Sequence, residues 1–169
     1  RGSICTALFR KEILHDLRFP KGILHEDEEF TPQLMLRAEN LYFTNNKAYY
    51  YRKREGSIMH KRDKRWHIRR LADAEQVLYR LKERVDYLPV KERIVMERRI
   101  AQLTMDHIYN VITMTHDETH LNHVLQRLSR HGLFPLPDKD YTSKYKWFRR
   151  MTNSSFGRKT LIMLLRAKG

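Results

Sequence analysis

Several features that define common protein classes are scarce or absent in this sequence. Cys5 is the only cysteine among 169 residues, which excludes an internal disulfide framework and fits a reducing compartment. The longest apolar run, at 161–165, is far shorter than a membrane span. The chain begins with Arg1 rather than methionine and no signal peptide follows, so we expect a piece of a longer, cytoplasmic protein. Its apolar fraction of 41% is typical of a folded domain.

Acidic residues are missing from the C-terminal stretch 141–169, which carries eight lysines and arginines. The stretch 52–70 is also basic, with nine lysines and arginines against Glu55 and Asp63. The formal net charge of the whole chain is +14. Such basic patches favour anionic partners, which can be phosphates, nucleic acid or the acidic face of a membrane.

The first 60 residues mix short elements of both kinds. Aromatic and β-branched runs predict strands at 4–9, 41–44 and 48–52. Residues 10–14 are expected to form one or two helical turns. Apolar residues at helical spacing predict an amphipathic helix from 27 to about 39.

After residue 60 the apolar spacing is helical throughout. The helices are expected at 71–88, 90–114, 121–132, 141–152 and 155–167. In the second of these helices, the predicted inner face consists of Ile94, Ala101, Met105, Ile108 and Ile112. A connector broken by two prolines, at 133–140, precedes the last two helices, which are short and basic.

Four adjacent carboxylates, Glu26, Asp27, Glu28 and Glu29, stand out in this basic chain. Acidic residues in the first turn of a helix complement its dipole by about 0.3–1 kcal/mol each, which is one interpretation. In the other, one carboxylate faces a reacting hydroxyl as a general base, with a pKa raised by its negative neighbours. The cluster alone leaves both interpretations open.

Five elements between residues 9 and 58 occur in an order that resembles a known enzyme family. These elements are Phe9-Arg10, the loop FPKG at 19–22, Glu26-Asp27 at a helix start, Ala38 near the helix end, and YRKREGSI at 51–58 after a tyrosine-rich strand. The order is similar to the C-terminal half of the catalytic domain in bacterial family-two inverting glycosyltransferases. The resemblance implies an α+β, mostly α fold: 1–60 as the acceptor side of a GT-A α/β domain, and 61–169 as a helical extension.

The resemblance also implies roles for the acidic cluster. Asp27 would be the catalytic base that takes the proton from an acceptor hydroxyl, while the oxygen attacks the anomeric carbon of a nucleotide-diphospho-sugar with inversion. Glu26 would orient this base or hold the acceptor. His25 is expected to be structural or to contact the acceptor. The acceptor would be a saccharide or a lipid-linked sugar in surface polysaccharide synthesis.

The donor side would involve the second basic stretch. Arg52 and Arg54 would neutralise the leaving diphosphate, although a solvated strand end remains the alternative for them. Ser57 would contact the donor or cap a helix. His60 is a weak metal candidate. The divalent ion of the family, Mg²⁺ or Mn²⁺, is held by an upstream Asp-x-Asp motif, and Asp-Lys-Asp at 138–140 is better interpreted as a helix cap. We therefore expect the metal ligands outside this chain, and this chain alone to be inactive.

The basic tail 141–169 has two interpretations. Aromatic and apolar residues lie on one face of its first helix, namely Tyr141, Tyr145, Phe148 and Met151, with cations around the rest. Such a helix can lie on an anionic membrane, at the inner face of the plasma membrane, or dock on the protein with a solvated basic side.

Two further function classes remain as alternatives. A non-enzymatic helical module could bind nucleic acid through its basic surface. The sequence contains no recognised nucleic-acid motif, however, so we do not expect nucleic acid as a partner. A helical interaction scaffold would leave 19–58 unexplained. The predicted strands would form the edge of an incomplete sheet, so we expect this piece to self-associate or to pack against its own helices.

Overall fold

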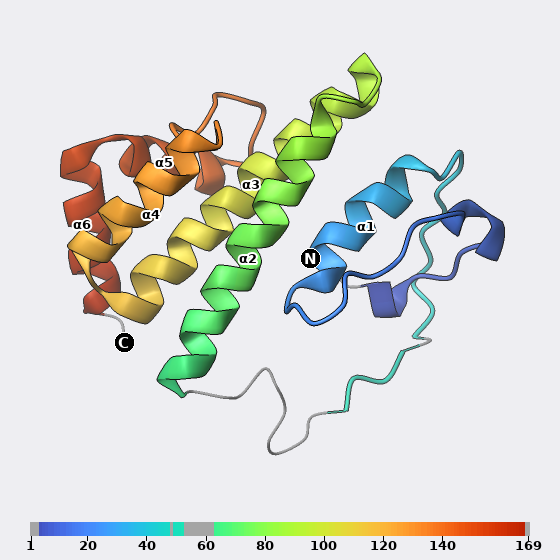
Figure 1. The fold of residues 1–169 in the computed structure, drawn as a ribbon, viewed down its shortest axis with the longest axis horizontal. Coiled ribbons are helices and arrows are strands. Elements are labelled where there is room, and N and C mark those ends of the chain that lie inside the picture. The colour runs from blue at the N-terminus through green and yellow to red at the C-terminus, as the bar shows by residue number, and fades with distance from the viewer. Residues whose placement is uncertain (1–3, 48, 53–62, 168–169) are drawn as a thin grey trace. The chain divides into compact units, whose positions relative to one another are not determined.

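The computed structural model describes residues 4–47, 49–52 and 63–167 (Figure 1). Two short 3₁₀ helices and six α-helices make up these ranges, in the order η1 (Ile4–Thr6), η2 (Lys11–Leu14), α1 (Glu26–Leu36), α2 (Lys64–Val85), α3 (Val90–Thr115), α4 (Glu118–Arg130), α5 (Ser143–Asn153) and α6 (Ser155–Arg166). The expectation of a mostly helical chain is confirmed. No strand forms in the described ranges, so the α/β part of the prediction is not confirmed.

The predicted strands are absent from the part of the chain that the structure describes. Residues 4–6 form η1 instead, and 41–44 and 49–52 are irregular and exposed, while residue 48 lies outside the description. A strand satisfies its backbone N–H and C=O groups through a neighbouring strand, and no described segment supplies one. The aromatic character of 41–52 is therefore not sufficient to form a sheet within this chain.

Most predicted helices agree closely with the observed ones, but the helix expected at 71–88 begins at Lys64 and ends at Val85. Helix α1 was expected from 27 and begins at Glu26, and α3 was expected over 90–114 and ends at Thr115. On α3, Ala101, Met105, Ile108 and Ile112 are buried as predicted. Ile94 is wrongly assigned to that inner face, because its side chain is 58% exposed and the buried face begins only at Met96.

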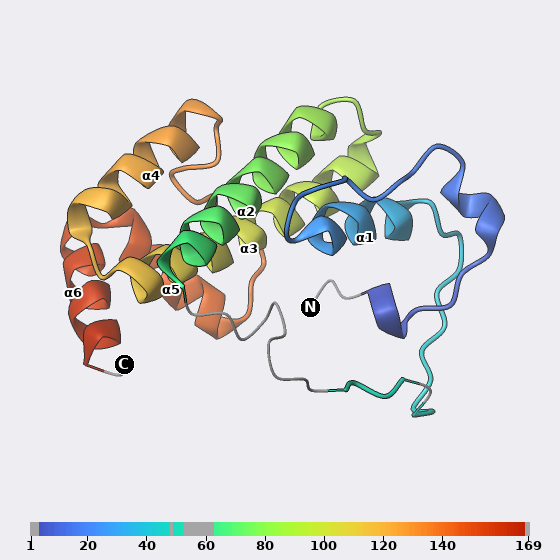
Figure 2. The same ribbon diagram turned by 60° about the horizontal axis from the view of Figure 1, so that its bottom comes forward.

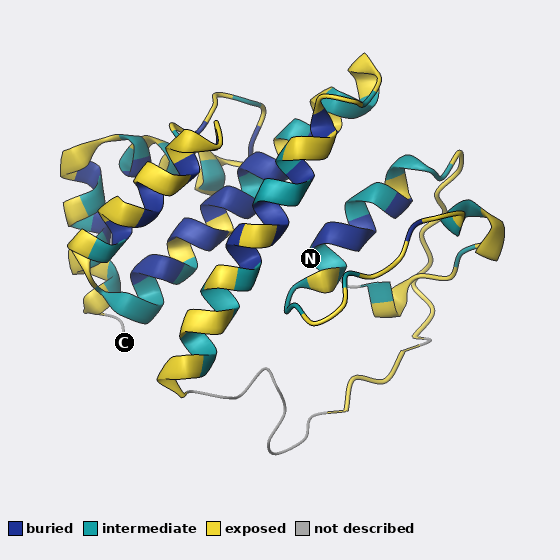
Figure 3. Ribbon diagram, in the orientation of Figure 1, coloured by how far each residue is buried: buried dark blue, intermediate teal, exposed yellow. Residues whose placement is uncertain are grey.

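The chain divides into two units, Arg1–Val77 and Leu78–Gly169, and the boundary falls within α2. The boundary predicted near residue 60 lies in 53–62, outside the described residues. The first unit contains η1, η2, α1 and the first part of α2, and the second contains the remaining helices. Each unit has buried residues of its own, shown in dark blue in Figure 3.

The core of the first unit is small. Leu17, Phe30 and Leu34 are buried together, and the partly buried side chains around them are Ile4, Phe9, Ile13 and Leu14. Residues of η1 and η2 thus cover one side of α1. Because few apolar residues are involved, polar contacts must supply much of the orientation between these short elements.

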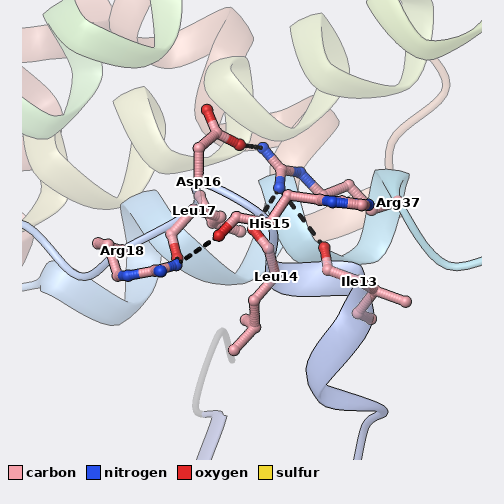
Figure 4. A network of polar contacts seen from close by, with 7 residues as sticks. All are labelled: Ile13, Leu14, His15, Asp16, Leu17, Arg18 and Arg37. Atoms are coloured by element: carbon pink, nitrogen blue, oxygen red, sulfur yellow. Dashed lines mark hydrogen bonds and ion pairs between the residues drawn. The ribbon is translucent and has the colours of Figure 1, made fainter.

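Arg37, at the C-terminal end of α1, makes most of those polar contacts (Figure 4). Its guanidinium donates to the carbonyls of Leu14 and Ile13 in η2. Its Nη2 also lies 2.8 Å from Asp16 Oδ1. Arginine suits this position because five N–H donors in one plane can satisfy several oxygens at once. One side chain therefore joins the end of α1 to the segment that precedes it.

Helix α3 is central to the second unit, where it contacts α4, α5 and α6 (Figure 2). The connector 133–140 is fixed at several points. The Asn153 side chain both accepts from and donates to the backbone of Leu136, each at 2.9 Å. Lys139 Nζ lies 2.7 Å from Glu97 Oε2 on α3 and lowers the pKa of that carboxyl group. The prolines of this connector therefore do not leave it loose.

The interpretation of Asp-Lys-Asp at 138–140 as a helix cap is wrong. The N-cap of α5 is Thr142, without a side-chain capping bond. Asp138 Oδ1 lies 2.6 Å from Arg149 Nη2, and Asp140 Oδ1 lies 3.7 Å from Lys146 Nζ. The two aspartates stop short of the helix start, so they bind basic side chains further along α5 rather than its first N–H groups.

Gly157 brings α6 very close to α5. A Cβ atom at this position would lie 2.7 Å from the Cα of Met151, which is closer than real Cβ atoms come to backbone. The adjoining N-cap, Ser154, accepts a hydrogen bond from the Gly157 N–H at 3.3 Å. Glycine is therefore required here for space, although alanine is the better helix former.

Replacing Gly157 by alanine should destabilise the second unit. The added methyl group meets backbone atoms that cannot rotate away, so we expect the free energy of unfolding to fall by about 1–3 kcal/mol. Chemical denaturation followed by circular dichroism measures this loss. Ser155→Ala, an exposed position on the same helix, should change stability by less than about 0.5 kcal/mol. Equal stability of the two variants would contradict the close approach.

Candidate functional site

The FPKG loop at 19–22 is held against α1. The Phe19 ring stacks on the ring of Phe30, with centroids 3.9 Å apart and planes 14° from parallel. Phe30 is in the core of the first unit, so the loop is attached to that core by its first residue. Gly22 has φ +78, a left-handed conformation that favours glycine, and the space around it is open. This loop motif thus turns the chain toward the start of α1.

The residues between the loop and α1 are tied to the first part of α2. Arg69 Nη2 donates to the Gly22 carbonyl at 2.8 Å, and the Leu24 N–H donates to Asp73 Oδ2 at 2.9 Å. Arg69 Nε also lies 3.5 Å from the same Asp73 oxygen. One i,i+4 pair on α2 therefore holds two backbone groups of the loop.

His25 is the N-cap of α1 and adopts a left-handed conformation with φ 65. Its Nε2 accepts from Arg70 Nε at 3.4 Å, and its Nδ1 lies 3.5 Å from Glu28 Oε1. Because an arginine Nε only donates, Nδ1 carries the ring proton in neutral His25 and faces Glu28. These contacts agree with the structural role considered for His25. Its contact with an acceptor stays a prediction.

The four carboxylates differ in their surroundings, although all belong to the first turn of α1. Glu26 is exposed, Asp27 and Glu28 are half-buried, and Glu29 is buried. Burial raises the pKa of Asp27 above its ordinary value, and the negative charges of Glu26 and Glu28 raise it further. No ion pair of Asp27 occurs within 4–47, 49–52 and 63–167.

Asp16 provides a contrast within the same unit. Its carboxylate accepts from Arg37, and this hydrogen bond and the arginine charge hold the pKa of Asp16 below its ordinary value. Asp16 is thus a carboxylate stabilised in its charged form by a structural partner. Asp27 is a carboxylate whose charged form is disfavoured, which is the property of a proton acceptor with a raised pKa.

The predicted donor-side residues fall mostly outside the described residues. Arg54, Ser57 and His60 all belong to 53–62, and only Arg52 is described, as an exposed residue. Within the described ranges, no group of three or more His, Cys, Asp or Glu side chains lies together in a way that could hold a metal ion. The structure therefore describes the surroundings of the predicted acceptor-side residues, His25, Glu26 and Asp27, which are consecutive in the sequence. The predicted donor-side roles stay predictions.

Two features of this site were missed in the sequence. The first is the set Arg69, Arg70 and Asp73, which lies more than 40 residues after the loop that it holds. Its i,i+4 charge pair is visible in the sequence, but its target is not. The second is Pro32 inside α1, which has no N–H to donate to the carbonyl of Glu28 one turn earlier.

Comparisons with known proteins were made at three levels. No family model, no curated protein and no solved structure matches this chain. The similarity to family-two glycosyltransferases therefore stays a prediction that depends on the five elements between residues 9 and 58. No helix in the described residues is long and apolar enough to cross a membrane.

Substituting Asp27 by asparagine should raise the free energy of unfolding at neutral pH. A pKa raised in the folded state means that the charged carboxylate is disfavoured there, so stability falls as pH rises through the unfolded and then the folded pKa. The neutral amide removes that penalty at neutral pH. In acid, where Asp27 is protonated, the variant and the wild type should have equal stability. Denaturant unfolding across this pH range measures the difference.

Asp16→Asn is the matched control with the opposite sign. Because Arg37 lowers the pKa of Asp16, the charged form contributes stability above the unfolded pKa and loses it as pH falls through the folded pKa. This variant should therefore be less stable than the wild type at neutral pH and equal to it in acid. Destabilisation of the same sign by both variants would contradict the contrast between the two aspartates.

Replacing Asp73 by alanine should loosen the entry to α1. The Leu24 N–H would lose its acceptor, at a cost of about 1 kcal/mol for a partly buried donor. Hydrogen exchange of the Leu24 amide should therefore become faster. Asp73→Asn keeps an acceptor oxygen and should retain slow exchange, and Asp86→Ala, at an exposed site, should leave the Leu24 amide unchanged. Unchanged exchange in Asp73→Ala would show that the loop is held by other contacts.

Proposed function

We propose that this chain is the acceptor side of an inverting glycosyltransferase that uses a nucleotide-diphospho-sugar, in surface polysaccharide synthesis. Asp27 would take the proton from the acceptor hydroxyl as its oxygen forms the new bond to the anomeric carbon. The bond from that carbon to the diphosphate breaks at the same time, and the diphosphate leaves with the bonding electrons. The donor sugar is a hexose or another glycosyl group.

The observation that carries the proposal is the environment of Asp27. A general base works best when its pKa lies nearer the operating pH than that of an ordinary aspartate. Partial burial and two negative neighbours shift the pKa of Asp27 in that direction. Asp16, a carboxylate of the same unit that is held by Arg37, has a pKa shifted in the opposite direction.

The supporting contacts favour a positioned base. The helix start is fixed on one side by the stacking of Phe19 on Phe30 and on the other by the hydrogen bond from Leu24 to Asp73. Such contacts limit the movement of Asp27, which belongs to the first turn. Proton transfer needs this because the base must come within about 2.6–3.2 Å of the hydroxyl oxygen.

The donor side of the proposal depends on the charge of the second basic stretch. Arg52 is exposed and described, and Arg54 and Ser57 would act beside it on the diphosphate. A divalent ion, Mg²⁺ or Mn²⁺, would neutralise further charge on the leaving group. The ligands of this ion would lie outside this chain. We therefore keep His60 out of the proposed site.

The exposed aromatic residues between 41 and 51 fit a segment that acts with a partner. Tyr42, Phe43 and Tyr50 are almost fully in water. Large apolar side chains in an extended, unpaired segment favour pairing with another strand or with a second copy of this chain. Self-association through this segment is therefore part of the proposal.

Asp27→Asn should strongly slow sugar transfer by the polypeptide that the complete reading frame encodes. Loss of a positioned general base lowers kcat by about 10²–10⁴-fold, while KM for the donor should change little, since the donor is held elsewhere. Release of the nucleoside diphosphate from a panel of nucleotide sugars, with and without saccharide acceptors, measures this. Glu26→Gln should have a smaller effect.

Asp16→Asn serves as the control in the same assay, because Asp16 also belongs to the first unit but is bound by Arg37. Its transfer rate should stay within about twofold of the wild type at a temperature where both are folded. Full activity of Asp27→Asn would contradict the assignment of the base. Absence of transfer from every nucleotide sugar tested would contradict the proposed reaction.

A further inference from the structure

Helix α6 has one face inside the second unit and another face in water. Gly157 and Leu161 are buried on the inner face. Phe156 and Met163 are seven residues apart and therefore lie on the same side of the helix, where 80% and 72% of their surfaces are exposed. Two large apolar side chains thus form an outer stripe on a helix that is already docked.

Cations border this stripe. Lys159 lies three residues after Phe156, and Arg166 lies three residues after Met163, so each is adjacent on the helix surface. Lys159 makes no ion pair within the described ranges, while Arg166 donates to the carbonyl of His116. A cation beside an exposed apolar side chain is the composition of a helix that lies in a lipid interface.

Helix α5 repeats the same combination. Trp147 is half-exposed, and Lys144 and Arg150 lie three residues before and after it. Neither cation forms an ion pair in the part of the chain that the structure describes. The basic residues of α5 that do have acidic partners, Lys146 and Arg149, bind the connector instead. The cations next to the exposed tryptophan are therefore available for an external anion.

We propose that the outer face of α6, with Trp147 of α5, binds the surface of an anionic lipid bilayer. Phe156 and Met163 would enter the boundary between headgroups and acyl chains, and Lys159 would lie at the lipid phosphates. The inner faces of both helices stay packed in the protein, as their buried residues Phe148 and Leu161 require. This inference does not depend on the proposed sugar transfer.

The charge and the apolar side chains together favour a membrane over nucleic acid. No acidic residue occurs from 141 to 169, so neither helix carries a negative charge of its own that would repel an anionic surface. Nucleic acid would use the cations, but most of its contacts with proteins are hydrogen bonds to phosphate and sugar, which Phe156 and Met163 cannot make. The boundary between headgroups and acyl chains would remove both apolar side chains from water while the lipid phosphates meet the cations beside them.

Co-sedimentation of the whole chain with vesicles tests the proposal. We expect binding to vesicles made of phosphatidylcholine and phosphatidylglycerol in equal amounts, and much weaker binding to phosphatidylcholine alone. Phe156→Ser/Met163→Ser should weaken binding to the mixed vesicles by about tenfold or more. Lys144→Gln and Lys159→Gln should each weaken it by about fivefold, and added salt should weaken binding of the wild type.

Ile94→Ser/Val95→Ser is the matched control. These two apolar side chains on α3 are 58% and 60% exposed and belong to the same unit, and their removal should leave vesicle binding unchanged. Circular dichroism establishes that each variant is folded, and the exposure of every substituted side chain favours that result.

Three results would overturn the proposal. The first is no binding of the wild type to the mixed vesicles. The second is undiminished binding by Phe156→Ser/Met163→Ser, and loss of binding in Tyr42→Ser/Phe43→Ser would then assign the lipid contact to the first unit. The third is salt-sensitive binding to duplex DNA in a gel shift without any vesicle binding, which would identify the basic surface as a nucleic-acid interface.

Discussion

The crowding of four carboxylates into one helical turn is the constraint around which the first unit is built. Each charge raises the free energy of its neighbours in the ionised form, and the α1 N-terminus relieves only part of this. Glu26 is exposed to water, and Glu28 lies beside the protonated nitrogen of His25. Asp27 lies between these two residues in the sequence and is half-buried, so water stabilises its charge less than that of Glu26. Asp27 is therefore the residue of this turn whose pKa is raised by burial and by its negative neighbours.

Such a turn keeps its position only if the chain before it is fixed. The FPKG loop is stacked on the core through Phe19, and its end is held by Arg69 and Asp73 of α2. The network of Arg37 fixes the other end of α1 in the same way. Polar side chains at both ends thus do what a larger apolar core would do in a bigger unit, because Leu17, Phe30 and Leu34 alone bury little surface.

Periodicity predicted the helices well, since an inner face recurs every three or four residues and is visible in one sequence. Two wrong predictions show what periodicity cannot provide. Ile94 is apolar but exposed, and Asp138 lies near a helix start but binds Arg149. The strands failed for a different reason. Aromatic residues at 41–52 favour extended backbone, but a sheet needs a partner strand, which a propensity cannot supply. The contacts of His25 and Leu24 with α2 were also not predictable, because they join residues about 45 positions apart.

Helix α6 illustrates why an amphipathic pattern alone cannot decide what a helix binds. The apolar residues that follow the helical period, such as Leu161, are buried inside the protein, so they carry no information about an external partner. The informative residues are Phe156 and Met163, which break the pattern by being apolar on the polar side. The same reasoning applies to Asp27, which is informative because it departs from the stabilised state of Asp16. In both places, the informative residues are those whose surroundings in the folded chain do not explain them: Asp27 by its raised pKa, and Phe156 and Met163 by their exposure.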